Sequence, residues 1–211
     1  MLKEYEKIET VFLRDMNTKK LNEEKYRSKT IEFLKDIDWE FTEKIDGTNI
    51  RIYWDGHKVS YYGRTDKAQI PSQLMNRLIE LFGGNTNEEM FEQTFGETPA
   101  MLIGEGYGAK IQSGGDYRDD NDFILFDVCV NGKYIDREDV RQIANTFNID
   151  SVPVIMVGKL QEGIDYVKTQ PMSKIGKAKM EGLVARPLVE LNDKRGNRII
   201  VKIKCCDFKE E

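Results

Sequence analysis

Lys44-Ile45-Asp46-Gly47-Thr48-Asn49 is the stretch from which the fold prediction starts. Lys44 stands at the end of an apolar, β-rich segment, directly before an Asp-Gly turn. A position at a strand end, before a tight turn, suits a lysine that attacks a phosphate, because the turn lets the phosphate approach. A lysine ammonium is a poor nucleophile until nearby cations or desolvation favour its neutral form. The short pattern therefore predicts chemistry only if partners for a nucleotide and a metal follow in the chain.

The surrounding sequence predicts an α+β protein with a largely antiparallel core. Asp55-Gly56 separates two β-rich runs and predicts a two-residue hairpin turn. Helices are predicted over residues 22–36, 72–82, 87–95 and 136–148. Strands are predicted over 39–43, 49–54, 57–62, 100–103, 123–130, 182–187 and 199–204, with a buried strand over 152–157. Residues 104–122 read as a functional loop, and 164–180 are ambiguous with a short helix. We expect a single domain over residues 1–211.

Composition indicates a soluble globular protein of the cytoplasm. Of the 211 residues, 33% are charged and 39% are hydrophobic. The sequence contains no apolar run long enough for a membrane helix, and its first residues lack the apolar core of a signal peptide. The odd number of cysteines fits reduced thiols. The net charge of −5 means that a nucleic-acid contact needs a local basic patch, for which 194–204 is the candidate.

The clearest chemical signal lies near the C-terminus. Lys202 and Lys204 are two apart in a predicted strand, so both point to one face of the sheet. Two lysines on one face repel each other unless an anion lies between them, and a nucleotide phosphate is a suitable anion. Glu181 precedes a glycine, which lets a ligand approach. A carboxylate beside phosphate and lysines suggests a magnesium ligand, although Glu181 could instead pair with Arg186 or Lys179.

Two further residues could hold the nucleoside. Glu105 stands between two glycines and could accept hydrogen bonds from ribose hydroxyls, and Phe126 offers an apolar face to a base. The alternative is a surface turn for Glu105 and plain core for Phe126. The single histidine, His57, follows the hairpin turn and is expected at the surface, so histidine acid–base catalysis is poorly supported.

These motifs together resemble the covalent nucleotidyltransferases, the ATP-dependent ligases and capping enzymes. Among these, the chain is most similar to the phage RNA ligase 2 family of nick-sealing RNA ligases. The matching segments are 43–49, 103–112, 122–128, 181–187 and 197–204. The resemblance implies a nucleotidyltransferase (ATP-grasp-like ligase) domain of antiparallel β-sheets flanked by helices.

The resemblance also implies a reaction and a set of roles. Lys44 would attack the α-phosphate of ATP and become lysyl-AMP, AMP would pass to an RNA 5′-phosphate, and a 3′-hydroxyl would then displace it. The metal is expected to be Mg²⁺, with Mn²⁺ as the alternative, and Glu181 would bind it. The remaining roles are adenine contact for Glu43 and Ile45, ribose contact for Arg64 and Glu105, base stacking for Phe126, phosphate or metal-water orientation for Asn49, and α-phosphate contact for Lys202 and Lys204.

The resemblance leaves several points open. Ligases of this family carry a further C-terminal domain, and this chain stops soon after Lys204, so only the adenylyltransferase domain is expected. A minimal ligase, a fragment or a partner protein that supplies the missing contacts remain alternatives. The family places another active-site lysine in 164–180, and Lys168, Lys174 and Lys177 are candidates. Rival functions are a DNA ligase adenylation domain, a GTP-using capping enzyme, and a nucleotide- or RNA-binding module without turnover.

Overall fold

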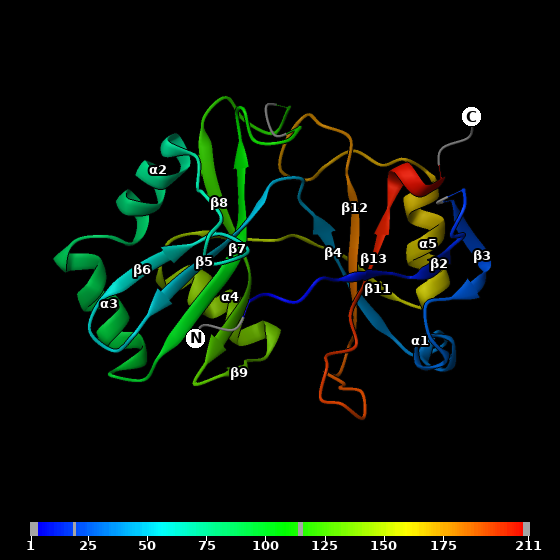
Figure 1. Ribbon diagram of the computed structural model, residues 1–211, viewed down its shortest axis with the longest axis horizontal. Coiled ribbons are helices and arrows are strands. Elements are labelled where there is room, and N and C mark those ends of the chain that lie inside the picture. The colour runs from blue at the N-terminus through cyan, green and yellow to red at the C-terminus, as the bar shows by residue number, and fades with distance from the viewer. Residues whose placement is uncertain (1–3, 19, 114–115, 209–211) are drawn as a thin grey trace. The chain divides into compact units, whose positions relative to one another are not determined.

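The computed structural model describes residues 4–18, 20–113 and 116–208. Internal contacts group the chain into two compact units. The first comprises Met1–Glu6 and Asp46–Val152, and the second comprises Lys7–Ile45 and Pro153–Glu211. The chain passes between the units directly after Lys44-Ile45. The expectation of a single domain over 1–211 stays a prediction, and each unit is described by itself below (Figure 1).

The first unit is built on a six-stranded sheet in the order β10-β8-β7-β5-β6, with β9 paired to β8. All neighbours are antiparallel except β10 and β8. Helices α2 and α4 pack against β8, and α3 packs against α2. The elements are β5 (Thr48–Trp54), β6 (Val59–Tyr62), α2 (Ser72–Phe82), α3 (Asn85–Phe95), β7 (Ala100–Gly108), β8 (Asn121–Val130), β9 (Lys133–Tyr134), α4 (Arg137–Thr146) and β10 (Asp150–Ser151).

One face of this sheet carries the core of the first unit. Its alternate residues are apolar, as in Ile50, Ile52 and Trp54 of β5, and they pack with apolar residues of the helices. An aromatic group that includes Phe82, Phe91 and Phe147 fills the space between the helices. The side chains between these positions point to the opposite face, because strand residues alternate. Polar residues of β5, β7 and β8 therefore gather on that second face.

The second unit is built on a five-stranded sheet in the order β1-β13-β12-β4-β11. Here β1 runs parallel to β13, and the other pairs are antiparallel. Helix α5 packs on β12 and β13, and α1 packs on the separate β2–β3 pair. The elements are β1 (Glu9–Thr10), β2 (Phe12–Arg14), β3 (Leu21–Tyr26), α1 (Lys29–Leu34), β4 (Trp39–Lys44), β11 (Val154–Gly158), α5 (Leu160–Lys168), β12 (Gly182–Pro187), β13 (Val201–Lys204) and the 3₁₀ helix η2 (Cys205–Phe208).

The predicted α+β class with antiparallel sheets is confirmed, but several element predictions are wrong. The helix expected over 22–36 begins only at Lys29. Residues Leu21–Tyr26 instead form β3, because pairing with β2 satisfies their backbone hydrogen bonds. Ser28 marks the true helix start, since its hydroxyl accepts a hydrogen bond from Ile31 N at 3.2 Å.

The hairpin turn and two loop regions also differ from the prediction. Residues 55–58 rather than two residues connect β5 and β6, and Asp55 accepts from the backbone of both residues 57 and 58. Strands β7 and β8 extend into the expected 104–122 loop and leave 109–120 as the connection. The strand expected to be buried over 152–157 is β11, whose Val154 and Val157 are 44% and 49% exposed because it lies at a sheet edge.

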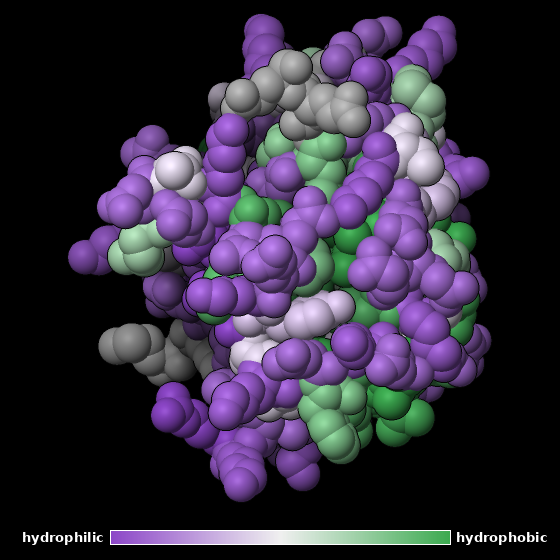
Figure 2. Space-filling view, turned by 90° about the vertical axis from the view of Figure 1, so that its right-hand side faces the viewer, coloured by the Kyte–Doolittle hydropathy of each residue, from purple (hydrophilic) through white to green (hydrophobic). Residues whose placement is uncertain are grey.

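The surface over β2, β3 and α1 is largely hydrophilic, with apolar groups between the charged ones (Figure 2). Exposed apolar side chains of these elements and their connection are Leu13, Met16 and Phe33. None of the helices in the described ranges is long and apolar enough to cross a membrane.

Candidate active site

The sheet of the second unit gathers lysines on one of its faces. Trp39 and Phe41 of β4 point into the core, so Lys44 at the end of that strand points to the opposite face. On β13, Val201 and Ile203 are buried in the same core while Lys202 and Lys204 point away from it. The prediction that these two lysines share a face is thereby confirmed.

Gly182 separates Lys44 from Lys204 in the sheet. The register places Gly182 of β12 opposite Lys44 on one side and opposite Lys204 on the other. A Cβ atom at Gly182 would lie 2.0 Å from the carbonyl oxygen of Ile203 and 2.8 Å from Lys204 Cα. The strand can pass here only without a side chain, and this opens the space between the two lysines.

Glu181 bridges these lysines. Its Oε2 lies 2.6 Å from Lys44 Nζ, and its Oε1 lies 2.9 Å from Lys204 Nζ. Because the carboxylate side chain is only 14% exposed, both contacts are shielded from bulk water and stronger than surface ion pairs. Of the alternatives for Glu181, the structure supports ion pairs with Lys44 and Lys204 rather than with Arg186 or Lys179.

The cluster carries more positive than negative charge. Burial lowers the pKa of Lys202, and Lys44, Lys204 and Lys7 lower it further, against a smaller opposing effect of Glu181. Burial also disfavours the charged form of Lys204, but its hydrogen bond and ion pair with Glu181 outweigh this and raise its pKa. One carboxylate thus faces several ammonium groups, an arrangement that favours binding of a further anion.

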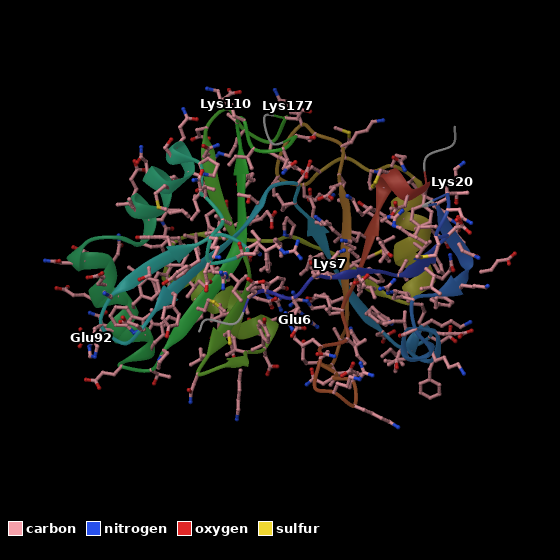
Figure 3. All side chains as sticks on the ribbon, in the orientation of Figure 1. Glu6, Lys7, Lys20, Glu92, Lys110 and Lys177 are labelled. Atoms are coloured by element: carbon pink, nitrogen blue, oxygen red, sulfur yellow. The ribbon has the colours of Figure 1, made fainter. Side chains whose placement is uncertain are left out.

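Lys7 is a member of this cluster that the sequence reasoning missed. It lies on the segment that runs into β1 (Figure 3), and β1 pairs with β13 so that Thr10 lies opposite Lys202. Its only sequence signal was a basic residue close before a short β-rich run, which is too common to be informative. Tertiary pairing of the N-terminal segment brings it near Lys202.

Glu43 and Ile45 have buried side chains, 1% and 3% exposed. Glu43 lies on the core side of β4, and its Oε2 accepts a hydrogen bond from the backbone N of Lys174 at 2.8 Å. Any contact of these two residues with a base would therefore come from the backbone. The Glu43 side chain instead anchors the turn between Ser173 and Ala178, which is closed by a backbone hydrogen bond of 3.0 Å.

The three candidates for a further lysine differ in their surroundings. Lys168 is engaged on α5, where its Nζ lies 2.7 Å from Glu23 Oε2 and 5.4 Å from the centre of the Phe208 ring. Lys174 and Lys177 are exposed in the turn that Glu43 anchors. Because Lys168 is already paired with Glu23, the exposed Lys174 and Lys177 are the better candidates.

The expected nucleoside residues lie in the first unit. Asn49 of β5 and Glu105 of β7 are opposite each other in the register and point away from the core face. Phe126 falls where the β7–β8 register shifts, because Ile103 and Gly104 pair with Asp127 and Leu125. The centres of the Phe126 and Tyr5 rings are 5.2 Å apart, and the rings are tilted by 58°. The Phe126 side chain is only partly buried.

Arg64 is exposed. The residue before it, Gly63, is hydrogen-bonded by the buried side chain of Arg51. The Arg51 side chain is 0% exposed, and its Nε donates to Gly63 O at 2.9 Å. Its Nη2 lies 2.8 Å from Asp66 Oδ1, and its guanidinium lies 5.6 Å from the centre of the Tyr62 ring. Arg51 was also missed, although a lone arginine between apolar strand residues could have indicated a buried, structural cation.

The sequence-predicted site therefore falls into two groups. Lys44, Glu181, Lys202 and Lys204 are brought together on the sheet of the second unit, and their excess of positive charge suits an anion. Asn49, Arg64, Glu105 and Phe126 belong to the first unit. In the described ranges, no group of three or more His, Cys, Asp or Glu side chains could by itself hold a metal ion.

Comparison with known proteins identifies the family. The sequence profile of the RNA ligase family matches residues 37–204, which span every site residue named above except Lys7. This chain belongs to the RNA ligase family. A comparison with curated protein sequences found no significant match.

Solved structures of similar fold come from Naegleria gruberi RNA ligase. A point variant with ATP and Mn matches with a TM-score of 0.66 and 19% identity, over 96% of this chain and 56% of that one. The form with pyrophosphate matches with a TM-score of 0.62 and 22% identity, over 83% and 52%. At these identities the likeness shows the fold, and the chain spans about half the length of these ligases.

Proposed function

We propose that this chain is an ATP-dependent RNA ligase domain that forms a covalent lysyl-AMP on Lys44. The observation that carries the proposal is the Lys44–Glu181–Lys204 bridge on one sheet face, within a chain of the RNA ligase family. Naegleria gruberi RNA ligase has been determined with ATP and Mn, and with AMP and Mn, which agrees with nucleotide and metal use by this family.

The charges of the site suit attack on a triphosphate. The Nζ lone pair of Lys44 forms the bond to the α-phosphorus, the bond to pyrophosphate breaks, and the Nζ proton passes to solvent. Lys44 Nζ lies 2.6 Å from Glu181 Oε2, so this contact must loosen before Nζ can attack the phosphorus. Lys202 and Lys204 stabilise negative charge on the phosphate, and Lys7 adds to the positive field.

Glu181 suits a metal that is shared with the nucleotide. Mg²⁺ or Mn²⁺ commonly binds one or two protein carboxylates together with phosphate oxygens, which matches a site with a single carboxylate among lysines. When bound, the metal would neutralise phosphate charge. Glu181 is the carboxylate of this cluster that would hold the metal.

The residues of the first unit are proposed to recognise the nucleoside. Asn49, Arg64, Glu105 and Phe126 keep their expected roles as phosphate, ribose and base contacts. Glu43 and Ile45 are proposed to contact adenine through their backbone. Support comes from the neighbouring positions of Asn49 and Glu105 on one sheet face and from the partly exposed ring of Phe126.

RNA is the proposed polynucleotide, either as a nicked duplex or as single-stranded ends. A partner protein could supply contacts to the duplex beyond those of this chain. We place the protein in the cytoplasm, which agrees with the lack of a disulfide among its three cysteines, at 129, 205 and 206, all of which the structure describes.

Incubation with α-³²P-labelled ATP and Mg²⁺ tests the proposal. Wild type should become covalently labelled, and Lys44→Ala should take up no label, while Lys174→Ala and Lys177→Ala show which of these two lysines contributes. Labelling of Lys44→Ala at the wild-type rate would disprove the assigned nucleophile. Labelling by GTP instead of ATP would favour a capping enzyme, and sealing of nicked DNA but not RNA would favour a DNA ligase.

A further inference from the structure

The connection between β7 and β8 holds the turn that follows Lys44. The backbone N of Ser113 donates to Asp46 Oδ2 at 3.3 Å, and the backbone N of Asp46 donates to Tyr117 Oη at 3.4 Å. Both contacts lie within the first unit. The side chain and the backbone of Asp46 are therefore held by the same segment of chain.

The other side of the turn is closed by strand β7. A Cβ atom at Gly47 would lie 2.4 Å from the carbonyl oxygen of Gly106 and 2.8 Å from Glu105 Cγ. The Asp46-Gly47 turn is thus packed directly against the backbone of β7. Strand β7 blocks one side of the Asp46-Gly47 turn. On the other side, the hydrogen bonds from Ser113 and to Tyr117 fix the orientation of the turn.

Tyr117 is itself held by aromatic and cationic contacts. It is 8% exposed and meets Tyr107 edge-to-face, with ring centres 6.0 Å apart. The Arg118 guanidinium lies 5.8 Å from the centre of the Tyr107 ring, and its Nη1 donates to Tyr107 Oη at 3.5 Å. Such contacts limit the rotation of both rings.

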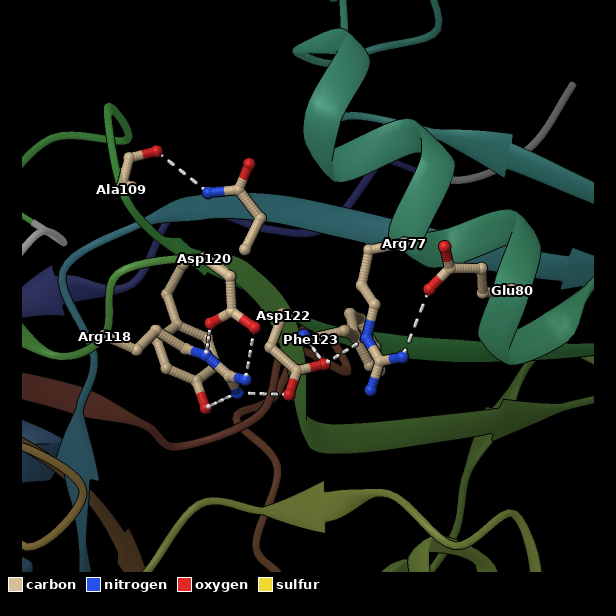
Figure 4. Close-up of polar contacts among 9 residues, drawn as sticks. Arg77, Glu80, Ala109, Arg118, Asp120, Asp122 and Phe123 are labelled. Carbon is tan, nitrogen blue, oxygen red and sulfur yellow. Dashed lines mark hydrogen bonds and ion pairs between the residues drawn. The ribbon is translucent and has the colours of Figure 1, made fainter.

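A shared carboxylate fixes Arg118 in turn (Figure 4). Asp122 on β8 forms an ion pair with Arg118 and a second one with Arg77 of α2, at 3.1 Å from its Nε. Asp120 accepts a further hydrogen bond from Arg118 Nη2 at 3.0 Å. The hydrogen bond to Asp120 is the main reason why the pKa of Arg118 is raised. The contacts therefore continue from helix α2 through this network to the turn after Lys44.

The two ends of the connection are also held by hydrogen bonds and by burial. Asn121 Nδ2 donates to Ala109 O at 2.8 Å, and Ala109 N donates to Asp120 O at 3.0 Å. Ile111 is 5% exposed and belongs to the core cluster of the first unit. These contacts pin both ends of the connection to the core of its own unit, so Tyr117 is presented from a fixed support.

We propose that Tyr117 is a positioning residue for the reaction of Lys44. It acts through the Asp46 backbone, which lies two residues after Lys44 in the chain. This inference rests on the proposed function. Loss of the Tyr117 hydroxyl should let the turn sample other orientations, so that the Lys44 amine spends less time aligned with the α-phosphorus.

Tyr117→Phe in the full chain tests this role, because it keeps the ring and removes only the hydroxyl. We expect the maximal rate of AMP transfer to Lys44 to fall about tenfold, in line with the loss of one hydrogen bond, while the ATP concentration for half-maximal rate stays unchanged. Asp46→Ala should lower the same rate without altering the tyrosine. Tyr61→Phe is the matched control, since Tyr61 lies on β6 outside the network, and it should react like wild type.

Hydrogen exchange of the peptide that spans residues 44–49 provides a readout independent of activity. Exchange there should rise in Tyr117→Phe and stay at the wild-type level in Tyr61→Phe. Unchanged exchange, or increased exchange with a wild-type rate of AMP transfer, would each overturn the positioning role. If the wild type takes up no AMP, the proposed function fails and the positioning role fails with it, while the exchange data still show whether Tyr117 holds the turn.

Discussion

The two units use their charges in opposite ways. In the second unit, Lys44 and Lys204 both pair with Glu181, and Lys202, with Lys7 close to it, adds further positive charge, so the cluster carries more positive than negative charge. In the network of the first unit, Arg77 and Arg118 are each paired with two carboxylates. An excess of positive charge on a partly buried face favours an anionic ligand, whereas arginines whose charges are all paired with carboxylates hold a scaffold. The first unit's network therefore supports structure, and the second unit's cluster suits phosphate chemistry.

Removal of the single acid in the cluster should have the largest effect. In Glu181→Gln, the lysines lose their shared carboxylate and the metal its proposed ligand, so we expect AMP incorporation to fall at least about 100-fold, the size of effect seen when one key polar group of an active site is lost. The initial rate of label uptake measures this. Glu92→Gln, an exposed change on α3, is the matched control. Wild-type activity in Glu181→Gln would show that the cluster is not the reactive centre.

Glycine substitutions compare how the two sheets tolerate a side chain. Gly182→Ala meets the backbone of β13, with the new Cβ 2.0 Å from Ile203 O, whereas Gly106→Ala meets the flexible end of Leu74 at 2.4 Å. We expect Gly182→Ala to lower the free energy of unfolding by about 3 kcal/mol or more and Gly106→Ala by about 1 kcal/mol. Urea denaturation of both variants measures which one lowers the free energy of unfolding more. If Gly182→Ala destabilised the protein no more than Gly106→Ala, β12 would be able to shift away from β13.

Lys7 should make a smaller, salt-dependent contribution to ATP binding. Because Lys7 is exposed and acts at longer range, Lys7→Ala should raise the ATP concentration for half-maximal AMP transfer about three- to tenfold at low salt, and less as salt screens its charge. Titration at two ionic strengths measures the effect, with exposed Lys20→Ala as control. An effect that persists unchanged at high salt would instead indicate a direct contact.

The smallest effect is expected at Tyr61 in the first unit. Its buried hydroxyl has no hydrogen-bond partner in the described part of the chain, so Tyr61→Phe should leave the free energy of unfolding unchanged or raise it by up to about 1 kcal/mol. Burial, with a further effect of Glu88, raises the pKa of Tyr61 from 10.0 to about 12.

The raised pKa adds a pH test to this variant. Between 10.0 and about 12 the unfolded chain loses the Tyr61 proton before the folded one does, so wild type should lose stability as pH rises through this window. Unfolding midpoints measured across that range should fall less steeply for Tyr61→Phe. Parallel curves for the two proteins would contradict the raised pKa.

Sequence patterns predicted the strongly periodic elements well. The helix Ser72–Phe82 and the strand Gly182–Pro187 have the predicted bounds. In the helix, apolar residues recur with the helical period, whereas the strand is a short apolar run bounded by glycine and proline. The helix expected over 22–36 failed in its first half, since pairing of β3 with β2 outweighed the local pattern. Lys7 was missed because its neighbour Lys202 is distant in sequence. Arg51 was missed because a single arginine in a strand pattern does not reveal that it holds the following turn through Gly63 and Asp66.

Spacing within one element was enough to predict that Lys202 and Lys204 share a face, since side chains alternate along any strand. Motif order was enough to identify the family. Tertiary structure alone decided that Glu181 bridges Lys44 and Lys204, that Glu43 anchors a turn, and that Tyr117 contacts the Asp46 backbone. The contacts of Glu181 with Lys44, of Glu43 with Lys174 and of Tyr117 with Asp46 join residues about 70 to 140 positions apart. Over such a distance local propensity carries no information, and only strand register and packing select the partner.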